Sequence, residues 1–478
     1  MNRLLRAAIP LGVGLGLALC PVPVGLTTSA WLYFAVFAAA ILALITEPIP
    51  LGATGIVSVV IIAVNGWGFS PKQLADPTFR PPAEAVKWAL AGFSNPTIWL
   101  IFGAFVFAMG YEQTGLGRRI ALLLVRTLGA RTLGLGYAIT LADLAVAPFT
   151  PSNTARSAGI IFPIVRNIPE IYGSHPEKSP RRIGAYLMWV AFASTCVTSS
   201  LFVTALAPNL LAVEIVKKMT GLEISWTQWF LGFLPIGGTL LLALPALAYW
   251  IYPPEIRKST EVAPWARREL AAMGAVSPKE WLMASLALTA LGLWIFGGHF
   301  IDPTLVAMAA VAVILLCEIV TWDQVLANKP ALNILAWFAS LFVLADGLNK
   351  VGFVTWFGTR AAMLLAGQSP LIVMILLVVI FFLVHYMFAS LTAHTTAVLP
   401  VVMAAGLAVP DMPVRTFALL LSFSIGLMGV ITPYATGPAP IYYGCGFLSR
   451  HDFWRLGFIF GVIFLGALLL IGVPTLSR

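Results

Sequence analysis

Charged side chains are scarce in this sequence. Only 10% of its 478 residues are Asp, Glu, Lys or Arg, whereas 60% are hydrophobic. An average soluble domain carries about 25% charged residues. A surface with so little charge is unfavourable in water, because exposed apolar area costs free energy there. The shortage of charge therefore excludes a soluble globular protein and predicts a chain embedded in the lipid bilayer.

Cysteine and histidine are also rare, with four and five residues. No C-x-x-C pair occurs and the cysteines lie far apart, so neither a disulfide framework nor a zinc site is supported. No H-E-x-x-H occurs and the histidines do not cluster, which argues against an intramembrane metalloenzyme. We therefore expect a protein that is not an enzyme and that carries no cofactor.

Basic residues exceed acidic ones, and the net charge is +9. They are scattered over loops with no aromatic-lined polar surface, which excludes nucleic acid as a partner. In membrane proteins Lys and Arg gather in cytoplasmic loops, and here they surround 120–166 and occur in 253–280. This pattern predicts a cytoplasmic N-terminus. With no long Ser/Arg-rich leader, we expect a multi-pass protein of a bacterial plasma (inner) membrane.

Long apolar runs recur along the whole chain. A bilayer-spanning helix needs about 20 mostly apolar residues, and the runs predict an all-α polytopic membrane protein of about eleven spans. The expected spans are 7–25, 29–46, 50–66, 97–115, 183–218, 228–252, 282–298, 302–320, 331–349, 413–447 and 453–475. The runs 183–218 and 413–447 are too long for one simple helix and carry polar or helix-breaking residues in the middle. We expect each to be a broken helix.

Two further apolar regions, about 120–166 and about 355–408, do not fit as spans. Each has two apolar arms around a polar tip, at Ser152–Arg156 and at Ser390–His394. Several arms are too short to cross a bilayer, so we expect re-entrant hairpins. Non-helical backbone is tolerated at membrane depth only where protein or a water-filled cavity surrounds it.

The two halves of the chain resemble each other at a nearly constant offset. Gly110 and Gly115 match Gly347 and Gly352, and the two hairpin tips match in the same register. Because the basic residues place the hairpins on opposite sides, the repeats have inverted topology, which is typical of secondary transporters with a site near the midplane. The expected parts are a first repeat with N-terminal spans at 1–252, a cytoplasmic linker at 253–280 and a second repeat at 281–478.

The tips read P-S-N-T-A-R and S-L-T-A-H. Their hydroxyl and amide groups, with the partial positive charge of helix N-termini, suit a carboxylate at each tip. The alternative is that the hydroxyls only cap helix ends, but the duplication of the tip favours binding of a dianion. The residues expected to contact substrate are Ser152, Asn153, Thr154, Ser390, Thr392, Thr432 and Pro433. Those expected to lie directly behind them are Ser199, Ser200, Thr395, Thr436 and Gly437.

Arg156 and His394 occupy equivalent repeat positions, each directly after the tip motif. A charge inside the membrane is costly and indicates function by default. Our hypothesis is that Arg156, and His394 when protonated, supply fixed positive charge where a sodium-coupled carrier would bind Na⁺. The alternative is that Arg156 pairs with Asp143 or extends to the interface, and that His394 is a neutral hydrogen-bonding residue. Na⁺ binding near Asn153 and Ser199 also stays open.

The chain resembles the divalent-anion/sodium symporter family in P-S-N-T-A-R-S-A-G, A-S-L-T-A-H-T-T-A and I-T-P-Y-A-T-G-P-A-P-I-Y-Y-G. In detail it looks like the 2-oxoglutarate/malate translocator branch. The resemblance implies a homodimer, two opposed re-entrant hairpins, an elevator-type movement, and substrate carboxylates held by the two tip motifs. The chain departs from the family at Leu391, where the motif has Asn, and at Pro148, where sodium-coupled members can use a hydroxyl. Both departures weigh against sodium coupling.

These observations together predict a secondary active transporter of C4 and C5 dicarboxylates. The expected substrates are 2-oxoglutarate, malate, succinate and fumarate, with citrate and tartrate also open. A sodium-independent antiporter is the favoured function, and a Na⁺-coupled symporter is the alternative. A channel does not need inverted broken repeats that meet at one site, and an intramembrane enzyme lacks the required motifs.

Overall fold

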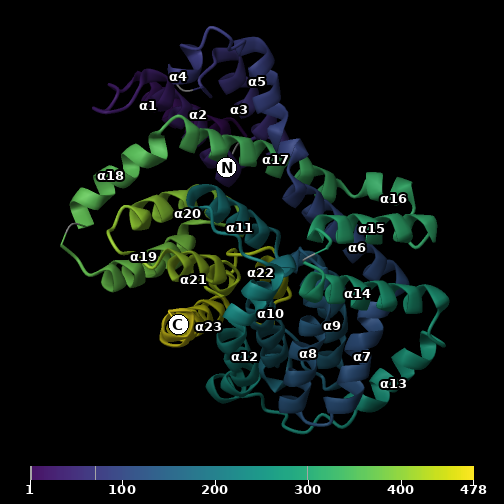
Figure 1. Ribbon diagram of the computed structural model, residues 1–478. Coiled ribbons are helices and arrows are strands. Elements are labelled where there is room, and N and C mark those ends of the chain that lie inside the picture. The colour runs from purple at the N-terminus through teal and green to yellow at the C-terminus, as the bar shows by residue number, and fades with distance from the viewer. Residues whose placement is uncertain (1–2, 70, 299, 366, 478) are drawn as a thin grey trace.

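The computed structural model describes residues 3–69, 71–298, 300–365 and 367–477, and the fold is a bundle of helices (Figure 1). Within these ranges nine helical segments are long and apolar enough to cross a membrane, and shorter apolar helices accompany them. The expectation of an all-helical polytopic membrane protein is confirmed.

Helices of the first half follow the apolar runs closely. They are α1 Arg3–Leu19, α2 Thr28–Thr46, α3 Leu51–Asn65, α4 Pro71–Leu74, α5 Pro81–Leu90, α6 Pro96–Thr114, α7 Leu116–Leu128, α8 Thr132–Val146, α9 Phe162–Ile171, α10 Gly184–Leu201, α11 Ala207–Thr220 and α12 Trp226–Ile251. A π-helix, Ala155–Ile161, leads directly into α9.

The linker and the second half contribute the remaining helices. They are α13 Val262–Ala272, α14 Pro278–Phe296, α15 Pro303–Leu316, α16 Trp322–Ala327, α17 Lys329–Lys350, α18 Phe353–Leu365, α19 Pro370–Val384, α20 Leu391–Leu407, α21 Val414–Leu427, α22 Ala439–Gly444 and α23 Arg450–Leu476.

Local sequence sets many of these boundaries. The Asn95 side chain accepts the backbone N–H of Thr97 at 2.8 Å, Pro96 follows at the first helical position, and Gly115 ends α6 in the left-handed conformation. These are the residue types that start and stop helices, because they satisfy or avoid the unpaired backbone groups at helix ends. Ser225 and Ser277 begin α12 and α14 with complete capping boxes.

The repeat is visible in the helix boundaries themselves. Helices α7 and α18 begin and end 237 residues apart, and α8 and α19 begin and end 238 residues apart. A short 3₁₀ turn follows each of the latter pair, at 147–149 and at 385–387. Equal spacing over several consecutive elements supports a duplicated unit rather than chance similarity.

The expected hairpins are shorter than their apolar regions. In the first region, α7 is a separate helix, and the tip at 150–154 lies between α8 and the π-helix that leads into α9. In the second, α18 is separate and the tip lies between α19 and α20. The hairpin boundaries of about 120 and about 355 are therefore corrected to Thr132 and Pro370, because Gly129 and the turn before Ser369 end the preceding helices.

Both long segments are broken helices, but the first break lies later than expected. Residues 195–200 belong to the last turns of α10, and the hydroxyls of Thr198 and Ser199 bond to carbonyls three or four residues back and so stay within the helix. The chain becomes extended at Phe202 and Leu206, just before α11 begins at Ala207 with Pro208 in its first turn. The second break, between α21 and α22, contains Thr432–Pro438 as expected.

Helix α10 is the centre of the molecule. All 18 of its residues are buried, and it packs against α8, α12 and α21. Figure 1 shows α17 crossing above α11 and α20, with the N-terminal helices on its other side. The polar run on α10 can exist at membrane depth because protein, not lipid, surrounds it.

The linker is more ordered than a tether. It contains α13, which packs on α7. Just after it, the Arg119 guanidinium bonds to both carboxylate oxygens of Glu280, at 2.6 and 3.2 Å, and to the carbonyl of Gly274 at 3.1 Å. Both side chains are nearly buried, with 10% and 4% exposed. This ion pair fastens the first half of the chain to the start of α14.

Replacing Arg119 with Met should lower the free energy of unfolding by about 3 kcal/mol, because Glu280 would keep a buried charge with no partner. The measurement is the thermal melt of the purified protein in detergent. Lys87→Ala is the control, since its ion pair with Glu84 lies on the surface and should change the melt little. Equal melts for R119M and the wild type would contradict the proposed fastening role.

Candidate functional site

Both hairpin tips line one cavity of about 290 Å³. Ligand pockets begin at roughly 300 Å³, so the cavity suits a small ligand. Five of the seven expected contact residues lie on its wall: Ser152, Asn153, Thr154, Ser390 and Thr392. Other elements complete it with Leu44, Glu47, Leu51, Phe105, Leu206, Trp337, Phe338, Thr436 and Gly437. Residues distant in sequence are thus brought together as the repeat predicted.

The serine of each tip caps the helical segment that follows it, in the same way in both repeats. Ser152 Oγ accepts the backbone N–H of Ala155 at 3.2 Å, and Ser390 Oγ accepts that of Ala393 at 3.3 Å. Capping uses the oxygen of each hydroxyl and leaves its hydrogen free to donate. Capping and binding are therefore compatible roles, because each serine can cap its helix and still donate to a carboxylate in the cavity.

Of the remaining tip side chains, one bonds to another part of the protein and two are free to contact a ligand. Asn153 Nδ2 donates to Thr436 Oγ1 at 2.8 Å, which ties the first tip to the second helix break. Thr154 and Thr392 also line the cavity, and their hydroxyls have no hydrogen-bond partner in the described parts of the chain. These two hydroxyls and those of the two serines are therefore free to donate to a ligand.

The second break presents different residues from those expected. Thr432 is fully buried and its hydroxyl accepts the backbone N–H of Tyr434 at 3.3 Å, within its own turn. Thr432 and Pro433 are absent from the cavity wall, whereas Thr436 and Gly437 lie on it.

Arg156 is completely buried and does not line the cavity. Its Nε donates to both oxygens of Asp143, at 3.2 and 3.3 Å, and Nη1 donates to the carbonyls of Thr150 and Ala205, each at 3.0 Å. Nη2 faces hydroxyls of α10, with Ser199 Oγ at 3.0 Å. The pairing with Asp143 is the arrangement that the sequence left open as the alternative.

The π-helix accounts for part of this placement. Arg156 is the second residue of Ala155–Ile161, and its backbone N–H bonds to the carbonyl of Ser152 at 3.0 Å. A π-helix inserts an extra residue per turn and commonly marks a functional site. The second tip has no such element, since α20 is a regular helix from Leu391 onward. The two repeats therefore differ at the residue after the motif.

His394 has a contrasting, apolar environment. Its ring is fully buried among Phe381, Phe388 and His385, with ring centroids 4.4, 5.0 and 5.0 Å away. Neither ring nitrogen has a hydrogen-bond partner in the described residues. The neighbouring Thr395 hydroxyl is likewise buried and unpaired there. Arg156 and His394 are equivalent in sequence but not in surroundings.

Two other candidates lie in the interior. Ser199 Oγ donates to the Thr195 carbonyl at 2.6 Å and accepts from Arg156. The guanidinium therefore fills the space beside Ser199 that was considered for Na⁺. Ser200 is fully buried, and its hydroxyl has no partner among the residues described.

His385 is a site residue that the sequence did not single out. It is fully buried, and Nε2 lies 2.8 Å from the carbonyl oxygen of Ala435 in the second break. Its repeat counterpart is Ala147, so it falls outside the duplicated motif. The sequence signal that marks His385 is a polar residue close to one tip with no polar counterpart in the other repeat.

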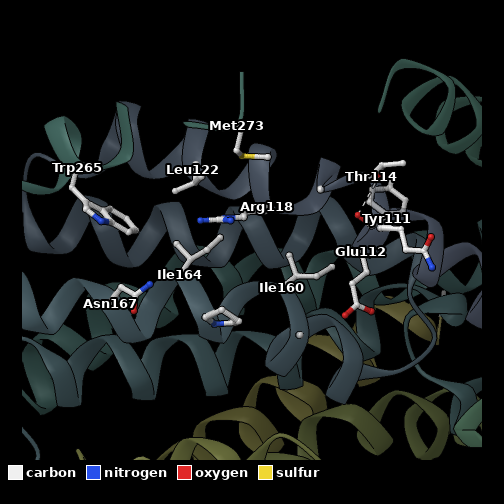
Figure 2. Close-up of a pocket in the computed structure, with 14 residues that line it drawn as sticks. Tyr111, Glu112, Thr114, Arg118, Leu122, Ile160, Ile164, Asn167, Trp265 and Met273 are labelled. Atoms are coloured by element: carbon white, nitrogen blue, oxygen red, sulfur yellow. Dashed lines mark hydrogen bonds between the residues drawn. The ribbon is translucent and has the colours of Figure 1, made fainter. Parts of the chain in front are cut away.

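A second, larger cavity of about 430 Å³ lies away from the tips, between the end of α6, the start of α7, α9 and the α13 region (Figure 2). Figure 2 shows Arg118 and Glu112 at separate points along it. Arg118 forms an ion pair with Glu269 at 2.7 Å, so its charge is compensated. This cavity lacks the two hairpin tips and their duplicated hydroxyl groups, which lie on the wall of the smaller cavity.

The family described as the sodium:sulfate symporter transmembrane region matches residues 1–475 of the chain. The L-tartrate/succinate antiporters of Escherichia coli (strain K12) and Shigella flexneri are each 50% identical to it over 471 residues, covering 98% of this chain and 97% of each relative.

Two solved transporters share the fold. The Alcanivorax borkumensis YdaH transporter superposes with a TM-score of 0.53 and 17% identity, covering 84% of this chain and 89% of its own. Neisseria gonorrhoeae MtrF gives a TM-score of 0.54 at 12% identity, covering 88% and 93%. At this identity the likeness extends to the fold alone.

Gly437 leaves no space for a side chain, because an added Cβ would collide with the Thr154 hydroxyl. Thr is stiff at χ1, so Gly437→Ala should displace the tip and weaken dicarboxylate binding by about tenfold. The measurement is the thermal stabilisation produced by succinate. Gly444→Ala is the matched control, since nothing lies within 4 Å of its Cβ position. Unchanged succinate binding in G437A would contradict the assignment of this wall.

Proposed function

The chain belongs to the sodium:sulfate symporter transmembrane family, and from this membership and the geometry of the tips we propose that it is a sodium-independent dicarboxylate antiporter. The family consists of transporters, so the chain is a transporter and not an enzyme. The observation that carries the proposal is the single cavity that both hairpin tips line.

The chemistry of this cavity favours a small dianion. Each tip places a helix N-terminus and free hydroxyl hydrogens on the wall, and such groups stabilise a carboxylate without a full positive charge. Two tips provide two such places. A ligand with one carboxylate at each end satisfies both, whereas a monoanion leaves one tip without a partner.

The substrates are C4 and C5 dicarboxylates. Relatives that share half of their residues with this chain exchange L-tartrate and succinate by their names, which favours this pair. Malate, fumarate and 2-oxoglutarate keep two terminal carboxylates and fit the same scheme, in line with the 2-oxoglutarate/malate branch that the motifs resemble. Citrate adds a third carboxylate, which the tips alone do not serve.

Antiport is favoured over sodium symport by two features. At the second tip, Leu391 stands where the family motif has Asn, so one amide is missing there. In the first repeat, the Arg156 guanidinium lies among carbonyl and hydroxyl oxygens that resemble a sodium coordination shell. A coupling ion leaves with the substrate, but a guanidinium cannot. The carrier would therefore keep this guanidinium, paired with Asp143, in every state, and no Na⁺ would need to bind there for the substrate to cross.

The transport cycle proposed here has further elements. The N-terminus is cytoplasmic, the repeats have inverted topology with hairpins re-entering from opposite sides, and the tip-bearing helices move as an elevator against the remaining helices. The working unit is a homodimer in a bacterial inner membrane. The basic loops and the duplicated helix order support this arrangement.

Counterflow in proteoliposomes tests the exchange. Labelled succinate should enter vesicles preloaded with L-tartrate, because each inward crossing requires an outward one. Entry should be the same with and without Na⁺, because no sodium ion is coupled to the exchange. Empty vesicles serve as the control. Strong Na⁺-dependent uptake into empty vesicles would replace antiport by symport, and no uptake under any condition would reject dicarboxylate transport.

The fixed-charge role is tested by Arg156→Ala and His394→Ala. Each should reduce exchange by at least about tenfold, because the buried site loses a cation or a potential cation. Arg415→Ala, on an exposed residue, is the control. The double variant Asp143→Asn with Arg156→Met removes both charges and separates loss of folding from loss of transport. Full exchange in both single variants would reject the fixed-charge hypothesis.

A further inference from the structure

We propose that His385 is a positioning residue that sets the spacing between the two tips and thereby the length of dicarboxylate that the carrier prefers. The proposal rests on the dicarboxylate transport proposed above. It concerns the segment 432–437, called here the crossing loop, which lies in the second helix break.

The crossing loop is fastened to both hairpins. On the side of the second hairpin, His385 Nε2 bonds to the Ala435 carbonyl at 2.8 Å, and the Tyr434 hydroxyl donates to the Tyr386 carbonyl at 3.0 Å. On the side of the first hairpin, Asn153 Nδ2 donates to Thr436 at 2.8 Å. Neighbouring residues of one loop are thus bonded to the two opposite hairpins, so the crossing loop sets the distance between the tips.

The chemistry of the His385 contact is defined by its partner. A carbonyl oxygen only accepts, so Nε2 must carry the hydrogen and donate it. Nδ1 has no partner in the described residues. The surrounding rings are those of His394 and, beyond it, the phenylalanines that also pack on His394. The function needed from His385 is therefore one donor at the Nε2 position.

The first repeat is fastened without such a side chain. Ala147 stands at the position equivalent to His385, and the first tip is held to its helix break by the Ala207 N–H to the Pro151 carbonyl at 2.8 Å and by Arg156. The second tip relies on His385 instead. Because Leu391 offers no polar side chain at that tip, its position depends on this hydrogen bond and on the neighbouring bond from Tyr434 to the Tyr386 carbonyl.

Tip spacing is a selectivity device because the two carboxylates of a ligand must reach both tips at once. Succinate and glutarate differ by one methylene and carry no other polar group. A rigid spacing discriminates between them, whereas a loosened second tip follows the longer ligand. Removing the donor of His385 should therefore change the ratio of the two KM values more than it changes the maximal exchange rate.

The experiment compares His385→Gln, His385→Leu and the wild type in proteoliposomes, with KM and kcat for exchange of succinate and of glutarate. A glutamine amide presents an N–H near the Nε2 position, so H385Q should keep the wild-type KM ratio and pH profile. H385L leaves a buried carbonyl unpaired and should shift the ratio by about tenfold. His451→Leu is the matched control, since that ring is 82% exposed.

The possible outcomes distinguish failure of the His385 positioning role from failure of the proposed dicarboxylate transport. An unchanged KM ratio in a folded, active H385L protein overturns the positioning role. Equal loss in H385Q and H385L, with a changed pH profile in H385Q, also overturns it and assigns His385 a proton-binding role. If H385L does not fold, Tyr434→Phe tests the same spacing role by removing the neighbouring hydrogen bond to the Tyr386 carbonyl, and an unchanged KM ratio in that variant overturns the proposal. Absence of dicarboxylate exchange in the wild type rejects the proposed function itself.

Discussion

The side chain of Arg156 lies entirely inside a chain whose surroundings are lipid, so its N–H groups must find their acceptors within the protein. It finds them on four separate parts: the carboxylate of Asp143 on α8, the Thr150 carbonyl at the start of the first tip, a hydroxyl of α10, and a carbonyl of the break after α10. The first tip, the first break and the central helix are thereby held in one arrangement. A different position for any of them would leave a buried charge or carbonyl unpaired.

The same requirement shapes the second repeat with different residues. The second tip has a histidine where the first has an arginine, and this histidine sits among aromatic rings without an acceptor. The polar fastening lies instead on the other side of the tip, between His385, in the turn after α19, and the Ala435 carbonyl. Duplication thus conserved the positions of the tips while the means of holding them diverged. An asymmetric pair of tips is compatible with a ligand whose two ends differ, such as malate.

Much of this arrangement was predictable from local patterns. Apolar run lengths predicted most of the long helices but not α5, α13 or α16, and the offset of the S-x-T-A motifs predicted the two tips that meet at one cavity. The errors were local as well. The hairpins begin later than expected because α7 and α18 are separate helices, and the first break lies after Ser200 because hydroxyls that bond within a helix do not interrupt it. Composition alone does not distinguish such a hydroxyl from one that faces a ligand.

The sequence by itself determined the membrane class, the repeat and the identity of the tips, because hydropathy and motif spacing are properties of neighbouring residues. Only the tertiary structure decided which groups meet. Asn153 and Thr436 are 283 residues apart in sequence, and His385 and Ala435 are 50 apart. Whether Arg156 faces a ligand or a carboxylate depends on how four segments pack, since a buried charge takes the acceptors that folding brings to it. Those choices are made by three-dimensional proximity, which no local pattern encodes.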